Sequence, residues 1–195
     1  MMEPALALLE FSSIAIGIEA GDSMVKRAPV EHIVTGTVQP GHYLVLVAGE
    51  VASVEEAMAA GRESGHVALA DSVFLPNVHP DVVKALTGEQ AVDLNDALGI
   101  VETQTVAAAI LAADAGLKGA EVKLVQLRLA DGLGGKGLAL FTGVVADVTA
   151  AVTIGSAVSA QQLVRQAIIP QLHSEMWPNI NRDGRFGSHF NWGKA

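Results

Sequence analysis

The chain contains two copies of one structural unit, and this duplication constrains its fold more than any other sequence feature. Residues 7–30 match residues 99–122 at 8 of 24 positions, and residues 41–61 match residues 135–155 at 9 of 21 positions. A composition rich in Ala, Val and Gly gives roughly one identity in ten by chance, so a repeated unit explains the agreement. The second copy is two residues longer between its aligned blocks, which predicts a loop at that place in both copies.

Each copy has the pattern strand–helix–strand–strand–helix–strand. In the first copy the expected strands cover residues 5–10, 30–38, 43–47 and 69–75. The expected helices run from a Ser12 or Ser13 cap to about Arg27, and from Ser53 through residues 54–64. Helical spacing predicts one buried face on the first helix, formed by Ile14, Ile18, Gly21 and Val25. This order predicts an α/β (α+β) fold: two tandem ferredoxin-like domains, each a four-stranded antiparallel sheet with helices packed on it.

The domain boundaries follow from the repeat. Residues 87–96 are polar and predict a linker, so the first domain with its linker is expected over residues 1–94. The second domain is expected over residues 95–179, followed by a C-terminal tail over residues 180–195.

Composition excludes several classes of function. The chain has 12 Lys and Arg against 21 Asp and Glu, a formal charge of -9, and no basic patch, which argues against nucleic acid or an anionic membrane as a partner. It has no cysteine, which excludes disulfides, thiolate zinc sites, cysteine-ligated iron–sulfur clusters and cysteine nucleophiles. Its longest uncharged stretch, between Asp147 and Arg165, carries too many polar residues for a membrane span. No secretory signal is visible, so a cytoplasmic protein is expected.

Two signatures carry a resemblance to a known family. One is Glu10 followed by residues 22–30, Asp-Ser-Met-Val-Lys-Arg-Ala-Pro-Val, and then a Pro-Gly hairpin loop. The second copy repeats it with Glu102, Ala113-Asp114 and residues 117–120. The chain resembles bacterial microcompartment shell proteins of the trimeric, tandem-domain type, most closely the propanediol-utilisation T type. The resemblance covers about residues 5–178.

The resemblance implies an architecture and its sites. Three chains would form a flat pseudo-hexameric tile, and tiles would pack edge to edge with hexameric, trimeric and pentameric shell proteins around enzymes. Two loops would surround a central pore: Thr37, Val38, Gln39, Pro40, Gly41 and His42 in the first copy, and Asp131, Gly132, Leu133, Gly134, Gly135 and Lys136 in the second. The implied tile-edge contacts are Lys26 and Lys118, with Asn77 and Gln171 where many relatives have Arg.

Some of these residues also have simpler interpretations. Lys26 and Lys118 lie near predicted helix C-termini, where a cation is stabilising in any protein. His42 is either an exposed strand residue or a member of a pH-sensitive ring at the pore. Residues 132–137 fit a G-x-G-x-x-G pattern, but a strand is expected after it, which favours a hairpin loop over a nucleotide site.

No metal or cofactor is expected. Relatives of the T type hold an iron–sulfur cluster through a pore-loop cysteine, whereas this sequence has Val38 at the corresponding position, which predicts an apolar pore rim there. The six histidines do not show metal-ligand spacing. Phe186, Phe190 and Trp192 of the tail are candidates for binding cargo or another shell protein, and a loosely ordered tail is the alternative.

No residue pattern argues for catalysis, so a non-enzymatic shell subunit with a pore for small metabolites is the expected function. The rival interpretation is a cytosolic ferredoxin-like oligomer that binds a small regulatory ligand between its domains.

Overall fold

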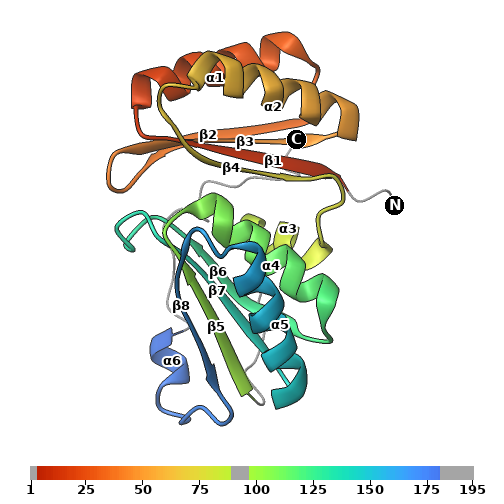
Figure 1. Cartoon of the computed structure of the whole chain (residues 1–195), viewed down its shortest axis with the longest axis vertical. Helices are drawn as coiled ribbons and strands as arrows, with labels where there is room; N and C mark the ends of the chain where they lie inside the picture. Colours follow the sequence, from red (N-terminus) through yellow and green to blue (C-terminus); the bar gives the residue numbers. More distant parts are fainter. Residues whose placement is uncertain (1–3, 89–96, 181–195) are drawn as a thin grey trace. The chain divides into compact units, whose positions relative to one another are not determined.

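The computed structural model describes residues 4–88 and 97–180 of the chain (Figure 1). The contacts within it divide the chain into two compact units, Met1–Val78 and His79–Ala195. Most of the predicted linker and almost all of the predicted tail lie outside the described residues. Phe186, Phe190 and Trp192 of the tail lie outside them too.

The first unit has the predicted order of elements. Its strands are β1 (Ala5–Phe11), β2 (His32–Val38), β3 (His42–Gly49) and β4 (Leu69–Leu75), and its helices are α1 (Ile14–Arg27) and α2 (Val51–Gly65). The strands form one antiparallel sheet in the order β2-β3-β1-β4. Both helices cover one face of this sheet (Figure 1), which confirms the predicted ferredoxin-like arrangement.

The second unit repeats this arrangement. Its strands are β5 (Ala97–Thr103), β6 (Lys123–Leu129), β7 (Gly137–Gly143) and β8 (Leu163–Ile169), and its helices are α3 (Pro80–Thr87), α4 (Val106–Gly119), α5 (Val145–Val158) and α6 (Trp177–Ile180). The antiparallel sheet has the matching order β6-β7-β5-β8. Even the bulges correspond, since the register shifts at Glu10/Phe11 in β1 and at Glu102/Thr103 in β5.

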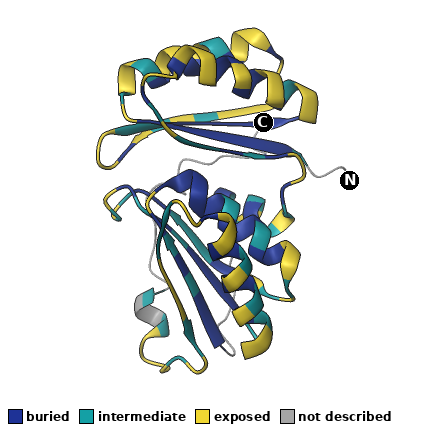
Figure 2. Ribbon diagram, viewed as in Figure 1, coloured by how far each residue is buried: buried dark blue, intermediate teal, exposed yellow. Residues whose placement is uncertain are grey.

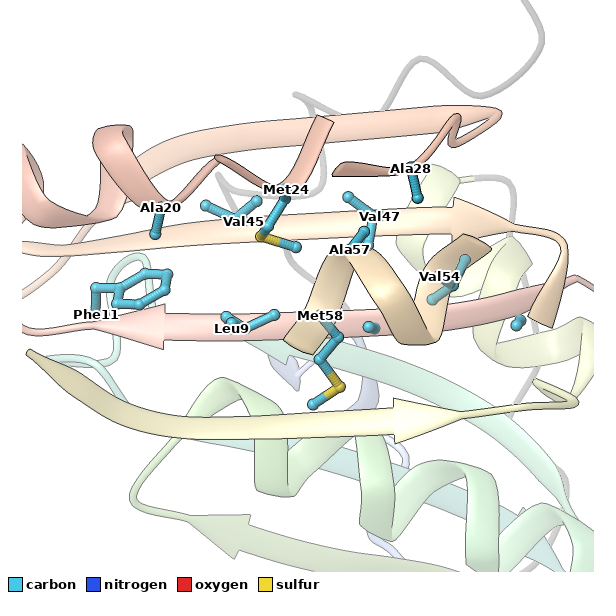
Figure 3. Close-up of a cluster of buried hydrophobic side chains, with 12 residues drawn as sticks. Leu9, Phe11, Ala20, Met24, Ala28, Val45, Val47, Val54, Ala57 and Met58 are labelled. Atoms are coloured by element: carbon cyan, nitrogen blue, oxygen red, sulfur yellow. The ribbon is translucent and has the colours of Figure 1, made fainter. Parts of the chain in front are cut away.

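The core of the first unit lies between the sheet and its two helices (Figure 3). Leu9 and Phe11 of β1 point to this side, and Met24 of α1 and Met58 of α2 meet them there. All four side chains are almost fully buried. Alternate residues of β1 point to the opposite side, hereafter the outer face, because successive side chains of a strand alternate.

The predicted buried face of α1 is wrong in three of its four residues. Gly21 is buried, but Ile14, Ile18 and Val25 are exposed. The helix packs through a stripe of small residues that lets its backbone approach the sheet closely. A Cβ added to Gly17 would lie 2.7 Å from the Cβ of Tyr43, so no larger side chain fits on that stripe.

The ends of the helices differ in part from the prediction. Ser13 caps α1, as expected, by accepting a hydrogen bond from the N–H of Ile16. Helix α2 begins at Val51 rather than near Ser53, because nothing between the turn at Gly49 and Ser53 breaks the helix. Helix α3 was not predicted from the sequence; it has Pro80 in its first turn and the left-handed Gly88 as its C-cap.

Candidate functional site

The first predicted pore loop is a tight hairpin between β2 and β3. Gly41 closes it by donating a backbone hydrogen bond of 2.9 Å to the carbonyl oxygen of Val38, with a φ of 110° that favours glycine. Thr37, Gln39, Pro40 and Gly41 are exposed. Val38 is only 4% exposed in the chain, and the apolar pore rim at this residue stays a prediction.

The second predicted pore loop is longer and joins β6 to β7. Its backbone folds back on itself, since Ala130 donates a hydrogen bond to the carbonyl oxygen of Lys136 and Leu133 donates one to Ala130, both 2.9 Å long. Strand β7 begins at Gly137, directly after the glycine pattern. The pattern therefore lacks the following helix that a dinucleotide site needs, as the sequence predicted.

A carboxylate anchors each loop at its base. In the first unit, Glu10 of β1 contacts Nδ1 of His42 at 2.9 Å through its Oε1 atom. In the second unit, Nζ of Lys136 donates a hydrogen bond of 2.7 Å to Oε1 of Glu102 on β5. The two pairs occupy matching positions in the repeat, so each unit ties the end of its hairpin loop to its central strand.

Burial distinguishes these two pairs. The side chain of Glu10 is 1% exposed and that of His42 is 25% exposed, whereas those of Glu102 and Lys136 are 31% and 43% exposed. His42 is thus a half-buried partner of a buried carboxylate rather than an isolated strand residue. Neither pair was predicted from the sequence. The signal for them is a single acidic residue inside an otherwise apolar strand, which both copies repeat.

The two predicted edge lysines lie in the last turns of α1 and α4. Lys26 pairs with Asp22 at 2.5 Å, and Lys118 pairs with Asp114 at 2.6 Å. Asp114 also accepts a hydrogen bond of 2.8 Å from the backbone N–H of His79, just before α3. As a result the side chain of Asp114 is 6% exposed, whereas that of Asp22 is 57% exposed.

The other two predicted edge residues lie in matching places as well. Asn77 follows β4 and Gln171 follows β8, and both are exposed. Close to Lys26, the first unit has a shallow groove of about 530 Å³, lined by Ser23, Lys26, Arg27, Ala60, Glu63 and Ser64. In the second unit Ile154 fills the matching space, since a Cβ on Gly119 would lie 2.4 Å from its Cδ1.

The residues present do not fit an iron–sulfur cluster. The sequence has no cysteine, and the buried alkyl side chain of Val38 offers no ligand atom. Among residues 4–88 and 97–180, no group of three or more His, Asp or Glu side chains is placed to hold a metal ion. Within the same residues, no helix is both long enough and apolar enough to cross a membrane.

Comparison with known proteins gives the family. The BMC domain family matches twice, over residues 5–78 and 97–172. The bacterial microcompartment shell protein PduT of Citrobacter freundii is 43% identical over 178 residues, which cover 90% of this chain and 97% of that protein. The carboxysome assembly protein CcmO of a Synechocystis strain is 27% identical, and the match spans 63% of its length.

Solved structures agree with this assignment. A microcompartment protein from Desulfitobacterium hafniense superimposes with a TM-score of 0.79 at 38% identity, covering 90% of this chain and 99% of that one. A fused, permuted hexameric shell protein shares the fold, with a TM-score of 0.58 at 22% identity and coverage of 81% and 84%. These findings favour a structural shell role over the ligand-binding rival. The chain belongs to the BMC domain family and is a bacterial microcompartment shell protein with two BMC domains in tandem.

Proposed function

We propose that three copies of the chain close into a ring-shaped tile, and that tiles pack side by side in the shell of a cytoplasmic microcompartment. The observation that carries this proposal is the complete duplication, which extends to sheet order, strand bulges, loop anchors and edge lysines. Two equivalent units per chain make a threefold ring pseudo-sixfold, and closed rings are the usual outcome of repeated head-to-tail contacts.

In this tile the two hairpin loops of each chain would surround the axis. The exposed groups of the first loop are the Thr37 hydroxyl, the Gln39 amide and backbone atoms, and the second loop offers glycine backbone. Such groups suit small polar metabolites, because pore width and lining hydrogen-bond groups decide selectivity. The Glu10–His42 and Glu102–Lys136 pairs would hold the loops at a fixed width.

The tile edge would carry Lys26, Lys118, Asn77 and Gln171 toward neighbouring shell proteins of the hexameric, trimeric and pentameric kinds. The interior surface of the shell would face encapsulated enzymes. The subunit itself has a structural and not an enzymatic role in this proposal, since its relatives are shell proteins.

Native mass spectrometry and electron microscopy test the proposal together. The expected species has three times the 20.1 kDa mass of the chain, and concentrated protein is expected to form ordered flat sheets. A monodisperse dimer that never forms sheets would contradict it. A chain divided near Asn95 gives a second test: the two halves are expected to be unstable alone and to reassemble when they are co-expressed.

A further inference from the structure

The groove beside Lys26 lies between the C-terminal turns of α1 and α2, within the first unit. The exposed residues of both helices are on the side away from the sheet, where the groove opens (Figure 2). Its volume of about 530 Å³ falls within the range of about 300–1,000 Å³ that is common for small-molecule pockets. Ala60 is the one apolar residue of its lining, and the other five are polar or charged: Ser23, Lys26, Arg27, Glu63 and Ser64.

The matching place in the second unit is filled and apolar. Ile154 replaces Ala60 there, and Gly119 replaces Arg27. A Cβ on Gly119 would lie 2.4 Å from Cδ1 of Ile154, so no side chain fits beside that isoleucine. The other polar residues except the lysine also have apolar counterparts, with Ser23, Glu63 and Ser64 corresponding to Ala115, Ala157 and Val158. The helix pair therefore packs in this fold without these polar side chains, so their presence in the first unit needs another explanation.

Arg27 is the cation of the groove whose hydrogen-bond donors are unused. Its Nη2 atom lies 3.9 Å from Oε2 of Glu63, which is too long for a hydrogen bond, and no described residue accepts one from this guanidinium. Lys26, in contrast, is bound to Asp22 at 2.5 Å. The side chain of Glu63 is 82% exposed, so water screens its charge. The planar guanidinium is thus available to bind an oxyanion.

Two hydroxyl groups, one from each helix, complete the set of donors. The Oγ atoms of Ser23 and Ser64 lie 3.2 Å apart, and Oγ of Ser23 lies 3.0 Å from the carbonyl oxygen of Glu19. Each hydroxyl has a single proton and rotates to suit its partners. Because Ser23 is able to donate to Glu19 or to Ser64, the proton of Ser64 can turn toward a ligand while Ser23 keeps a hydrogen bond.

We propose that this groove binds the phosphate group of a small metabolite, with Arg27 and the Ser64 hydroxyl as donors and Lys26 adding positive charge. The donors come from two helices and approach from different sides. A tetrahedral phosphate offers oxygens in several directions, whereas a carboxylate offers two oxygens in one plane. The remaining volume, next to Ala60, holds the organic part of a phosphate ester. The inference goes beyond the proposed shell role, because it gives one of the two units a ligand for which the other has no space.

Titration of the full chain with inorganic phosphate at constant ionic strength tests the site. Isothermal titration calorimetry is expected to show one saturable phosphate site per chain and weaker binding of acetate. Arg27→Ala is expected to weaken phosphate binding about tenfold or more, because charge-assisted hydrogen bonds are lost. Arg62→Ala is the matched control, since Arg62 donates to Ser72 and does not line the groove. Its phosphate affinity should stay within about twofold of the unmodified protein.

A double variant, Arg27→Gly with Ala60→Ile, reproduces the packing that the second unit already has and is expected to abolish phosphate binding. It replaces Arg27→Ala if circular dichroism shows that the single variant is not folded. Equal losses of affinity for Arg27→Ala and Arg62→Ala would refute the site, since net charge alone would then explain binding.

Acetate binding as tight as that of phosphate would refute the choice of phosphate. An unmodified protein with no saturable phosphate binding would refute the groove as a ligand site. Native mass spectrometry of the same samples separates this inference from the tile. A trimer that does not bind phosphate would contradict the groove alone, and a monomer that binds phosphate would contradict the tile alone.

Discussion

Replacing Lys118 with Ala is expected to destabilise the chain more than replacing Lys26, although the two lysines occupy matching positions in the repeat. The reason is the partner carboxylate. Asp114 is 6% exposed on its side chain and lies between Lys118 and the backbone N–H of His79, whereas Asp22 is 57% exposed. Without its lysine, Asp114 keeps one hydrogen bond but stays in a place that water solvates poorly.

The magnitudes follow from these exposures. An exposed pair spaced four residues apart on a helix contributes about 0.3–0.5 kcal/mol, which applies to Lys26. Removing one partner of a fully buried pair costs about 3–5 kcal/mol, but Lys118 itself is 40% exposed, so about 1–2 kcal/mol is expected. In a chain of this size each kcal/mol lowers Tm by about 2–4 °C, which predicts a loss of about 2–8 °C for Lys118→Ala and at most about 2 °C for Lys26→Ala.

Thermal melting at one fixed protein concentration measures this difference, because association shifts the apparent Tm. Lys84→Ala is the control, since Lys84 also pairs with an aspartate, at 2.8 Å on α3, but lies at no predicted tile edge. Equal losses of Tm for Lys26→Ala and Lys118→Ala would refute the reasoning from burial. A variant that combines Lys26→Ala and Lys118→Ala is expected to form fewer ordered sheets in electron micrographs than Lys84→Ala. Undiminished sheets would contradict the assignment of these two lysines to the tile edge.

Three further outcomes are expected. Phe11→Ala should lower the free energy of unfolding by about 3–5 kcal/mol, measured by urea denaturation, because this ring is fully buried in the first core; a loss under about 1 kcal/mol would mean that the cavity collapses. Gly137→Ala should prevent normal folding, because the added Cβ would lie 2.3 Å from the Cβ of Ala109 on α4. The control Gly132→Asn should melt like the unmodified protein, because Gly132 has open space around it and asparagine tolerates its φ of 75°. Lys136→Met should change Tm little but speed limited proteolysis of the second loop, because its bond to Glu102 is lost; unchanged cleavage would show that the loop needs no such anchor.

The order of elements and the sheet topology were predictable because the repeat supplied two independent samples of one pattern. A strand or helix that is weakly marked in one copy is supported by the other copy at the same offset. The four apolar strands per unit, separated by glycine, proline and polar turns, leave few arrangements that bury both helices on one face of a sheet. The structure confirms the ferredoxin-like arrangement that the sequence favoured.

The face of α1 was predicted wrongly for a physical reason. Helical spacing identifies a stripe of large apolar residues but does not say which surface covers it. The face of α1 that packs against the sheet consists of small residues such as Gly17 and Ala20. The helix backbone lies so close to the sheet that branched side chains do not fit there. The branched residues Ile14 and Ile18 are then left for a different surface, and sequence spacing alone does not distinguish the two cases.

The loop anchors were not predictable from the first unit alone, because each joins residues about thirty positions apart. Glu10 meets His42 only when β1 and β3 pair in register, with Glu10 opposite Leu44. Helix α3 was missed for another reason, since its eight residues carry only two buried side chains, Val82 and Leu86. A short helix with so little apolar periodicity resembles a linker in sequence.

Fusion of two units in one chain lets matching positions differ, and the structure shows where they have. A ring of identical single-domain subunits repeats every side chain six times, whereas a ring of tandem chains repeats each of two versions three times. Here the partner of the carboxylate on the central strand is a half-buried histidine in one unit and a lysine in the other. The two loops of a tandem chain can therefore be anchored by different side chains, which a ring of identical single-domain subunits cannot achieve.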